Sequence, residues 1–496
     1  MKRENLRFSL VERFGVIILA KPSINEVNTK SASHLWCGRD AIFGEKMFKR
    51  IQHIHFVGIG GSGMSGIAEV LLSLGYKVSG SDLKQSEVSD HLVLLGAKVF
   101  IGHDCKNILG ADVVVTSTAV HHTNPEVIEA EKNIIPVIPR VEMLAELARL
   151  KYTVTIAGTH GKTTTTSMTS LVLAKGGLDP TMVIGGRLKN INSGAKLGKG
   201  EFLIAEADES DGSFLKLSPA VTVVTNIDND HLDYYGTLDN IKRAFVEHIN
   251  SVPFYGTSII CTDDENIKSI IPQIKRRFQT YGFLGNPDFT AYEFSRSEAM
   301  FTFKVAHKGK ELGRASLRVP GKHNVLNALA AIAVGLELGI GFTQIASALS
   351  EYSGVARRME IKGEKGDILV MDDYGHHPTE VKATLAAVRE GWPQRRIVAL
   401  FQPHRYSRTA HIYKDFGTVF NIADIVKILP IYCAGEKSIP GVSSQLIIDA
   451  INNSGKQAKS YEGIESLKAE LKSGDIVITF GAGDIYKTGE ELLGSL

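Results

Sequence analysis

Cysteines are few in this chain and do not form spaced pairs. The 496 residues contain four, and no C-x-x-C spacing occurs among Cys37, Cys105, Cys261 and Cys433. Neither a disulfide framework nor a cysteine-based zinc site is therefore expected. We expect four ordinary thiols in a reducing compartment.

The sequence also has no long apolar run. None approaches the roughly 20 residues that a helix needs to cross a bilayer. The longest early run, Phe14 to Ala20, is preceded by Glu4 and Glu12 as well as basic residues and lacks a small-residue cleavage pattern, so a signal peptide is not favoured. We expect a cytoplasmic protein that does not bind a membrane.

Neither sign of charge is in excess. Lys and Arg number 56 against 54 Asp and Glu, and no basic block with interleaved aromatic residues occurs. A nucleic-acid partner is therefore not expected. At about 150 residues per domain, the length suggests roughly three domains, each large enough for a core.

The most informative segment is KYTVTIAGTHGKTTTT, from Lys151 to Thr166. A β-branched strand leads directly into a glycine-rich loop and a helix start, which is typical of phosphate binding, although the loop is shorter than G-x-x-x-x-G-K-[ST]. Lys162 supplies a charge for the β/γ-phosphates and Thr163 offers a hydroxyl to Mg²⁺. An ordinary core helix after a turn is the alternative. The predicted nucleoside triphosphate site comprises Gly158, Thr159, His160, Gly161, Lys162, Thr163 and Thr164.

Two apolar strands further on each end in a group of carboxylates. They are LIAEADESD, Leu203 to Asp211, and VTVVTNIDNDHLDYYG, Val221 to Gly236. An open α/β sheet gathers ligands at strand C-termini, and nucleotide-bound Mg²⁺ needs one or two hard oxygen ligands. Glu206 and His231 are candidate metal ligands, together with Thr163. Taken singly, four other acidic residues also fit solvated loop charges: Asp208, Glu209, Asp228 and Asp230.

A βαβ pattern opens the first unit. We expect a strand at Ile51 to Gly58, a helix at Gly61 to Gly75 and a strand at Lys77 to Ser81. The glycines from Gly58 to Gly63 and an acidic residue about 20 positions on, Asp82, follow the spacing of a dinucleotide fingerprint. Taken alone, this pattern predicts NAD binding.

The rest of the chain continues to alternate strands and helices. Further strands are expected at Val113 to Ser117 and Ile135 to Ile138, and the third unit opens with GVARRMEIKG before strands within ILVMDDYG, RIVALFQP, IVKILPIY and DIVITFGAGD. This alternation predicts mostly parallel sheets. We therefore expect an α/β protein with Rossmann-like domains at residues 47–150 and 355–496 and a central P-loop ATPase domain at residues 151–354.

Histidine and arginine candidates gather in the third unit. The segments DDYGHHP, Asp372 to Pro378, and HRYSR, His404 to Arg408, each follow an apolar strand. Loops at strand ends often carry functional side chains. Because arginine binds a carboxylate through two donors, Arg405 and Arg408 are candidates for a substrate carboxylate. A solvated basic loop is the alternative.

Together these motifs resemble the ATP-dependent Mur ligases of peptidoglycan synthesis. The resemblance rests on G-T-H-G-K-T-T, E-A-D-E-S-D, T-N-I-x-x-D-H-x-D, G-x-H-N-x-x-N-A at Gly321 to Ala328 and D-D-Y-G-H-H-P-T-E at Asp372 to Glu380. Within the family, HIHFVGIGGSGMSGIAE at His53 to Glu69, the DYGHHP variant and FQPHRYSRT at Phe401 to Thr409 resemble the branch that adds L-alanine. The resemblance runs from about Met47 to the C-terminus.

The resemblance implies a ligase that uses ATP and Mg²⁺, acts on UDP-N-acetylmuramate and L-alanine, and is a monomer or weak homodimer. For ATP it adds His323, Asn324, Arg357 and Arg358. For the UDP-sugar it implies Gly60, Gly61, Ser62, Gly63, Met64 and Asp82. The catalytic set would be Lys162, His231, His376 and Asp373, with His376 or Asp373 helping to deprotonate the alanine amine. The amino-acid site would contain His376, Arg405 and Arg408.

The sequence departs from the family pattern in two places. Several Mur ligases have a carbamylated lysine 14 positions after the histidine of the N-x-x-D-H segment, whereas this chain has Phe245 there and Lys242 nearby. This departure fits the alanine-adding branch and removes one presumed Mg²⁺ ligand. Residues 1–46 have no counterpart in the pattern, so we expect either a mis-assigned start or a flexible, lineage-specific arm.

Other functions explain part of the sequence. An NAD-dependent dehydrogenase would use Gly58 to Gly63 but would leave the phosphate loop unused. A folylpolyglutamate synthase or a muropeptide-recycling ligase would share the central domain and differ in the substrate domain. A non-enzymatic ATP-binding switch would bind nucleotide without forming a peptide product.

Overall fold

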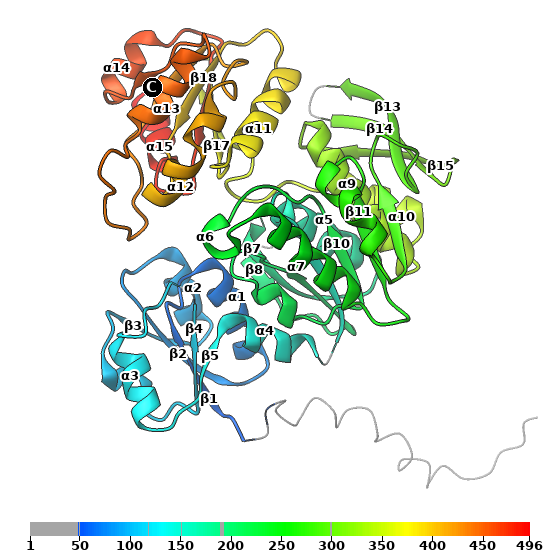
Figure 1. Cartoon of the computed structure of the whole chain (residues 1–496), viewed down its shortest axis with the longest axis vertical. Helices are drawn as coiled ribbons and strands as arrows, with labels where there is room; N and C mark the ends of the chain where they lie inside the picture. The colour runs from blue at the N-terminus through cyan, green and yellow to red at the C-terminus, as the bar shows by residue number, and fades with distance from the viewer. Residues whose placement is uncertain (1–47, 49, 118, 150, 189–192, 298–299) are drawn as a thin grey trace, which may run out of the picture. The chain divides into compact units, whose positions relative to one another are not determined.

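A computed structural model describes residues 48, 50–117, 119–149, 151–188, 193–297 and 300–496. The expected N-terminal arm, residues 1–46, lies outside these ranges. The described chain forms three β-sheets accompanied by helices, which confirms the predicted α/β class (Figure 1). Within these ranges, no helix combines the length and apolar character that crossing a bilayer requires.

The first sheet has five parallel strands in the order β3-β2-β1-β4-β5. The strand order reverses beside β1, and in such sheets the C-terminal ends of the strands form a crevice at that point. The predicted glycine loop follows β1. The elements are β1 (His53–Val57), α1 (Ser62–Ser73), β2 (Lys77–Asp82), α2 (Glu87–Leu94), β3 (Lys98–Ile101), β4 (Val113–Thr116), α3 (Pro125–Lys132), β5 (Val137–Pro139) and α4 (Arg140–Ala148).

The second sheet has ten strands in the order β15-β14-β13-β12-β11-β10-β6-β9-β7-β8. Its centre is parallel, and antiparallel pairs form both edges. Because β6 lies between β10 and β9, the phosphate loop after β6 is adjacent to both carboxylate-bearing strand ends. The elements are β6 (Tyr152–Ala157), α5 (Lys162–Lys175), β7 (Thr181–Leu188), β8 (Ser193–Lys196), β9 (Phe202–Glu206), β10 (Val221–Val224), α6 (Leu232–Tyr235), α7 (Leu238–Asn250), β11 (Thr257–Cys261), α8 (Glu265–Ile270), β12 (Phe278–Tyr281), β13 (Phe289–Ser297), β14 (Met300–His307), β15 (Lys310–Leu317), α9 (Lys322–Glu337) and α10 (Phe342–Ser350).

Helix α9 is buried along most of its length and packs against α5 and α10. Its small residues permit a close approach. A Cβ added at Gly335 would come within 2.9 Å of Val172 on α5 and 2.8 Å of Ile345 on α10. The apolar character of this helix is therefore explained by packing, and its polar first turn is available for the site.

The third sheet has six strands in the order β16-β17-β21-β18-β19-β20, of which only β16 runs antiparallel to its neighbour. Two peripheral strands, β16 and β20, lie outside the four strands expected from the sequence. The elements are β16 (Glu360–Lys365), β17 (Ile368–Asp373), α11 (Pro378–Gly391), β18 (Ile397–Phe401), α12 (Tyr406–Ile412), β19 (Ile425–Ile428), α13 (Gln445–Asn453), β20 (Lys459–Ser460), α14 (Ile464–Glu470), β21 (Ile476–Phe480) and α15 (Tyr486–Ser495).

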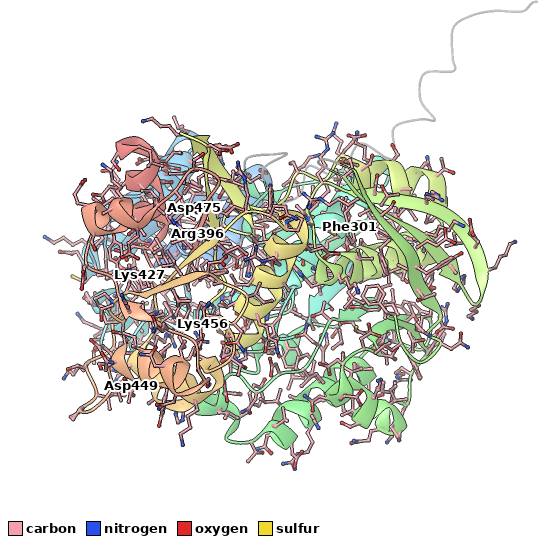
Figure 2. The ribbon with its side chains drawn as sticks, turned by 90° about the horizontal axis from the view of Figure 1, so that it is seen from above. Phe301, Arg396, Lys427, Asp449, Lys456 and Asp475 are labelled. Carbon is pink, nitrogen blue, oxygen red and sulfur yellow. The ribbon has the colours of Figure 1, made fainter. Side chains whose placement is uncertain are left out.

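Both faces of the third sheet are buried, which accounts for its continuous apolar strands. Leu369 and Met371 of β17 pack with α11 and α13, whereas Ile368 and Val370 pack with α14 and α15. Arg396 and Asp475, at the starts of β18 and β21, form two hydrogen bonds of 2.9 and 2.7 Å (Figure 2). This ion pair ties the two strands together at the end away from the predicted site.

Candidate functional site

The phosphate loop requires glycine at two positions. Gly158 and Gly161 have φ values of +126° and +80°, in the region that side chains disfavour. A Cβ on Gly158 would overlap the side chain of Thr225, and one on Gly161 would lie 2.8 Å from Oδ1 of Asn327. The loop is therefore held closely against the end of β10 and the first turns of α9.

The ammonium of Lys162 is fully partnered. Nζ donates to the carbonyls of Gly158 and Thr159 and lies 2.7 Å from Oε2 of Glu209, whose side chain is only 2% exposed. Burial lowers the pKa of Lys162, but the charges of Glu209 and Asp208 outweigh this effect and raise it. Lys162 is thus a cation within the predicted phosphate-binding loop.

The four acidic residues that singly fit solvated loop charges all form ion pairs, and that interpretation is wrong for Glu209 and Asp230, whose side chains are only 2% and 13% exposed. Glu209 pairs with Lys162, as described above. Asp208 lies 2.7 Å from Arg140, Asp228 lies 2.9 Å from His160, and Asp230 lies 3.2 Å from Arg408. Arg408 lies on α12 of the third unit, and Asp230 lies in the loop after β10 of the second sheet. These carboxylates therefore connect segments that are distant in the sequence.

Two of the three predicted metal ligands lie together. Thr163 and Glu206 line the same cavity, and the carboxylate of Glu206 accepts the amide of Gly185 at 2.8 Å. Burial raises the pKa of Glu206. A Cβ on Gly185 would lie 2.6 Å from that carboxylate, so the backbone fixes it in place. Hydroxyl and carboxylate oxygens are hard ligands, and this pair therefore fits Mg²⁺.

His231, the third predicted metal ligand, is next to different carboxylates. Its Nε2 lies 3.7 Å from Asp230 and 3.9 Å from Glu209. The residue has a left-handed backbone with φ of +56° and begins α6. Glu209 thus links His231 to Lys162, and the part of His231 in binding a metal stays a prediction.

A cavity of about 650 Å³ brings all three sequence units together. The first unit contributes the predicted Gly61, Gly63 and Met64, and also Arg140. The amide of Gly60 instead donates to Asp82 at 2.9 Å, which fixes the loop after β1. Ser62 is the first residue of α1. The other predicted residues that line the cavity are Lys162, Thr163, Glu206, Arg357 and Arg358.

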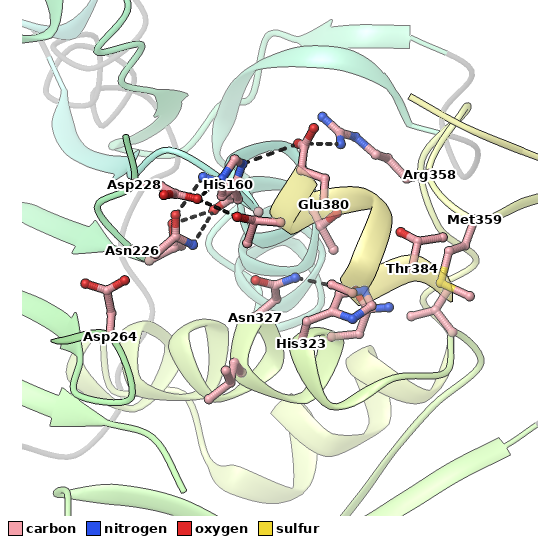
Figure 3. A pocket seen from close by; sticks show the side chains of 18 of the residues that line it. His160, Asn226, Asp228, Asp264, His323, Asn327, Arg358, Met359, Glu380 and Thr384 are labelled. Carbon is pink, nitrogen blue, oxygen red and sulfur yellow. Dashed lines mark hydrogen bonds and ion pairs between the residues drawn. The ribbon is translucent and has the colours of Figure 1, made fainter. Parts of the chain in front are cut away.

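A second cavity, of about 440 Å³, lies between the second and third sheets (Figure 3). His160, Gly161 and Thr164 of the phosphate loop line it, as do His323 and Asn324 of α9, which confirms that these predicted nucleotide residues share one space. Apolar side chains complete the walls: Ile227, Tyr281, Val319, Leu326, Tyr352 and Met359. Burial lowers the pKa of His323 to about 4, so its imidazole is neutral. Such walls suit a flat heterocyclic base.

Arg358 lines both cavities. Its guanidinium lies 3.4 Å from Glu380 and stacks over Tyr374 with 5.2 Å between Cζ and the ring centroid. Burial alone would lower its pKa, and the neighbouring carboxylates, chiefly Glu380 and Asp373, raise it. A permanent cation therefore lies at the junction of the two cavities.

Arg357 lines only the larger cavity, and its guanidinium is held by groups of its own unit. Its guanidinium bonds to Asp372 at 3.0 Å and to the carbonyls of Gly481 and Gly483. Because these partners belong to the third unit, the geometry favours a structural role over the predicted contact with ATP.

His160, Asp228 and His377 bring possible metal-ligand atoms within 4.8 Å of one another. Nε2 of His160 faces Asp228 at 2.9 Å, while its Nδ1 faces Glu380 at 3.6 Å. Burial lowers the pKa of His160, but the hydrogen bonds to Asp228 and Glu380 outweigh it and raise the pKa to about 9. The imidazolium itself is therefore the cation of this cluster.

The two predicted proton acceptors differ in their surroundings. Burial raises the pKa of Asp373 to about 6, and its carboxylate accepts the amides of Met359 and Gly375. Burial lowers the pKa of His376 to about 3. Because a general base works best with a pKa near the ambient pH, Asp373 is the better placed of the two.

Of the predicted amino-acid residues, Arg405 and Arg408 lie after β18, Arg408 on α12, whereas His376 follows β17. Arg405 is exposed, whereas Arg408 is held by Asp230. The ring of His376 lies 5.7 Å from that of His404, which stacks on Tyr432. The structure therefore brings His376 and Arg408 into one neighbourhood with Asp230, on the third-sheet side of His231.

Sequence reasoning missed three residues of the site. Glu209 and Glu380 are inside motifs that the sequence displays, but a carboxylate in a motif does not reveal which cation it faces. Arg140 had no motif, and its only signal is its place directly after an apolar strand at the start of α4.

Family models match three consecutive parts of the chain. They are described as the Mur ligase family, catalytic domain (residues 53–152), the Mur ligase middle domain (156–335) and the Mur ligase, glutamate ligase domain (357–483).

Individual proteins are similar over nearly the same length. A UDP-N-acetylmuramate--L-alanine ligase of Endomicrobium trichonymphae is 59% identical over 90% of this chain and 99% of its own. The crystal structure of a UDP-N-acetylmuramate-alanine ligase from Thermotoga maritima has 31% identity and a TM-score of 0.77, covering 89% of this chain and 98% of its own. A murein peptide ligase structure from Psychrobacter arcticus has 24% identity and a TM-score of 0.66, covering 90% and 98%, and shares the fold.

Proposed function

The chain belongs to the Mur ligase family, and we propose that it joins L-alanine to the lactyl carboxylate of UDP-N-acetylmuramate at the expense of ATP. The observation that carries the proposal is the cavity in which the glycine loop after β1 meets Lys162, Thr163 and Glu206. A UDP-sugar held by that loop would present its carboxylate to the phosphate-transfer residues. The identity to the alanine ligase of Endomicrobium trichonymphae supports alanine as the amino acid.

A carboxylate does not react with an amine at neutral pH, so it must first be activated. A lactyl carboxylate oxygen attacks the γ-phosphorus of ATP, the bond to the β–γ bridging oxygen breaks, and an acyl phosphate and ADP result. Negative charge on the transferring phosphoryl oxygens is the principal obstacle. The groups that would stabilise this negative charge are Lys162, the amides of the phosphate loop and Arg358.

Thr163 and Glu206 would hold Mg²⁺, with His231 as a further candidate. When bound, the ion would neutralise phosphate charge and orient the phosphates. The buried, backbone-fixed carboxylate of Glu206 supports this assignment because it is held in place before any ligand binds.

The second half of the reaction forms the amide. The alanine amine loses a proton, attacks the acyl carbon and expels phosphate, with Asp373 as the favoured proton acceptor and His376 as the alternative. Arg405 and Arg408 would bind the alanine carboxylate. Exclusion of water by the third unit would protect the acyl phosphate from hydrolysis.

The remaining assignments follow from these roles. Gly60, Gly61, Ser62, Gly63 and Met64 would bind the UDP-sugar, with Asp82 holding their loop, while His323 and Asn324 would bind the adenine. We propose functional domains at residues 47–150, 151–354 and 355–496. The enzyme would act in the cytoplasm as a monomer or weak homodimer.

A product assay tests the proposal. The protein is incubated with UDP-N-acetylmuramate, ATP, Mg²⁺ and one amino acid or peptide at a time, and products are identified by mass spectrometry. We expect the alanine adduct together with stoichiometric ADP and phosphate. An adduct with a muropeptide only, or the absence of any product although the nucleotide binds, would contradict the proposal; a parallel incubation with a folate and glutamate in place of these substrates should give no adduct.

A further inference from the structure

His160 occupies an unusual place in the phosphate loop, because both of its ring nitrogens face carboxylates. Asp228, which follows β10, lies 2.9 Å from Nε2, and Glu380, on α11 of the third unit, lies 3.6 Å from Nδ1 (Figure 3). Only 12% of the His160 side chain is exposed. An imidazole with an acceptor on each side is held in its protonated form, since each nitrogen must then carry a hydrogen.

Glu380 gathers donors from several directions. Its carboxylate lies 3.4 Å from Arg358 and 3.6 Å from Nδ1 of His376, and it accepts the amides of His376 and His377 at 3.1 and 3.3 Å. A carboxylate is an acceptor only, so all of these donors converge on one anion. Burial raises the pKa of Glu380, but the hydrogen bond from His160 and the surrounding cations outweigh it and hold the pKa well below its usual value.

Asp228 is shared in the same way. Besides His160, it accepts the hydroxyl of Thr379 at 2.6 Å and lies 3.5 Å from Nδ1 of His377. The rings of His160 and His377 are 4.8 Å apart. His160 from the loop after β6, together with His377 and Thr379 at the start of α11, thus surrounds the carboxylate of Asp228.

We propose that Asp228, His160 and Glu380 form a clamp that fastens the third unit to the phosphate loop, with Glu380 as a positioning residue for ATP. The inference rests on the proposed ATP-dependent function. Glu380 would act through His160, which shapes the phosphate loop, and through Arg358, which lies between the two cavities. It would touch neither the reacting carboxylate nor the amine.

The geometry explains why the clamp would favour ATP over the other substrates. His160, Arg358 and Glu380 all line the cavity assigned to the nucleotide, whereas neither His160 nor Glu380 lines the cavity that contains the glycine loop of the first unit. Loosening the clamp should therefore weaken nucleotide binding first. An additional effect on kcat is expected only if closure of the third unit limits turnover.

A double-mutant cycle tests the clamp. His160→Asn, Glu380→Gln and the double variant are compared in the full chain, because both substitutions keep polar groups while removing one charge. Glu390→Gln, an exposed position on the same helix, is the matched control. The readouts are the Kd of a non-hydrolysable ATP analogue, the KM values of all three substrates, and the thermal unfolding midpoint.

We expect each single variant to weaken the analogue about tenfold, the scale of one charged hydrogen bond. The double variant should lose far less than the product of the two single effects, while the control and the KM for UDP-N-acetylmuramate stay near the wild-type values. The clamp would be overturned if the effects of the two single substitutions simply multiplied in the double variant. It would also be overturned by equal changes in the KM values of all three substrates, or by folded variants that bind the analogue as tightly as the wild type. Binding of the ATP analogue can be measured without UDP-N-acetylmuramate or alanine. A failure of the clamp can therefore be told apart from a failure of the alanine product assay.

Discussion

Nζ of Lys162 lies 2.7 Å from Oε2 of Glu209, inside the loop that we assign to the ATP phosphates. A buried anion from the segment after β9 therefore lies against the phosphate loop. An incoming phosphoryl group must compete with Glu209 for the ammonium, and the pair keeps Lys162 charged and oriented before the nucleotide binds.

The first prediction separates the catalytic and structural parts of this pair. Lys162→Ala should lower kcat by about 10³-fold or more, the scale of a main charge-stabilising group in acyl or phosphoryl transfer. It should also destabilise the protein, because removing one partner of a buried ion pair costs up to about 3 to 5 kcal/mol. The double variant Lys162→Met, Glu209→Gln should recover the unfolding midpoint without recovering turnover. A folded Lys162→Ala enzyme with near-normal kcat would exclude the assignment.

The second prediction concerns pH. The clamp raises the pKa of His160 from 6.5 to about 9, so its contribution to closure is fully present below about pH 6.5 and is lost as the pH rises through about 9. Affinity for the ATP analogue should fall across this range by about tenfold in total, the same loss that we expect on removing the imidazolium by mutation. His160→Asn should bind weakly with a shallower pH dependence. If the affinity of the wild type and of His160→Asn depended on pH in the same way, the titrating group would be the nucleotide or a residue other than His160.

The third prediction tests the amino-acid site. Replacing Arg408 or Arg405 with Lys keeps the charge but loses the planar pair of donors. If either residue binds the alanine carboxylate, the KM for alanine should rise about ten- to a hundredfold, corresponding to one charged hydrogen bond of roughly 1.5 to 3 kcal/mol. The KM values for ATP and the UDP-sugar should change much less. Equal changes in the KM values for alanine, ATP and the UDP-sugar would instead indicate that Arg408 serves mainly to hold Asp230 across the two units.

The fourth prediction concerns the first unit, where Glu126 is fully buried. Burial raises its pKa, but the nearby imidazole of His55, 3.7 Å away, and hydrogen bonds from Ser81 and Asn107 outweigh this and lower it from 4.5 to about 2. The charged group thus stabilises the fold by about 3 kcal/mol above pH 4.5, and this is lost as the pH falls through about 2.

Glu126→Gln tests this contribution, with Glu131→Gln on the exposed face of α3 as the control. At pH 7, hydrogen exchange of the β1 and β2 amides should quicken in Glu126→Gln only. At pH 3 the difference in these exchange rates between Glu126→Gln and the wild type should be smaller. The same exchange rates in both variants at pH 7 would show that the buried network contributes little.

The sequence predicted the three units and part of the lining of the two cavities, chiefly the glycine loop after β1 and the phosphate loop after β6. These loops could be found because each directly follows an apolar strand. It could not predict the partners of those residues. His160, Asp228 and Glu380 come from three separate motifs: the pairing of β6 with β10 makes His160 and Asp228 neighbours, and the packing of α11 beside the phosphate loop adds Glu380.

Edge strands were missed for a related reason. The four residues of β3 are half-exposed and lack clear alternation, and β16 pairs antiparallel at a sheet edge, where propensity and burial are weaker signals. Central strands such as β17, buried on both faces, carry continuous apolar sequence and were found.

The central claim is that a lactyl carboxylate is activated by phosphoryl transfer before the alanine amine attacks it. UDP-N-acetylmuramate carrying ¹⁸O in both oxygens of that carboxylate tests the claim most directly, with ATP and L-alanine as the other substrates. One labelled oxygen should leave in the released phosphate and the other should remain in the new amide, both visible by mass spectrometry. Alanine product accompanied by unlabelled phosphate, or no alanine product at all, would contradict the account.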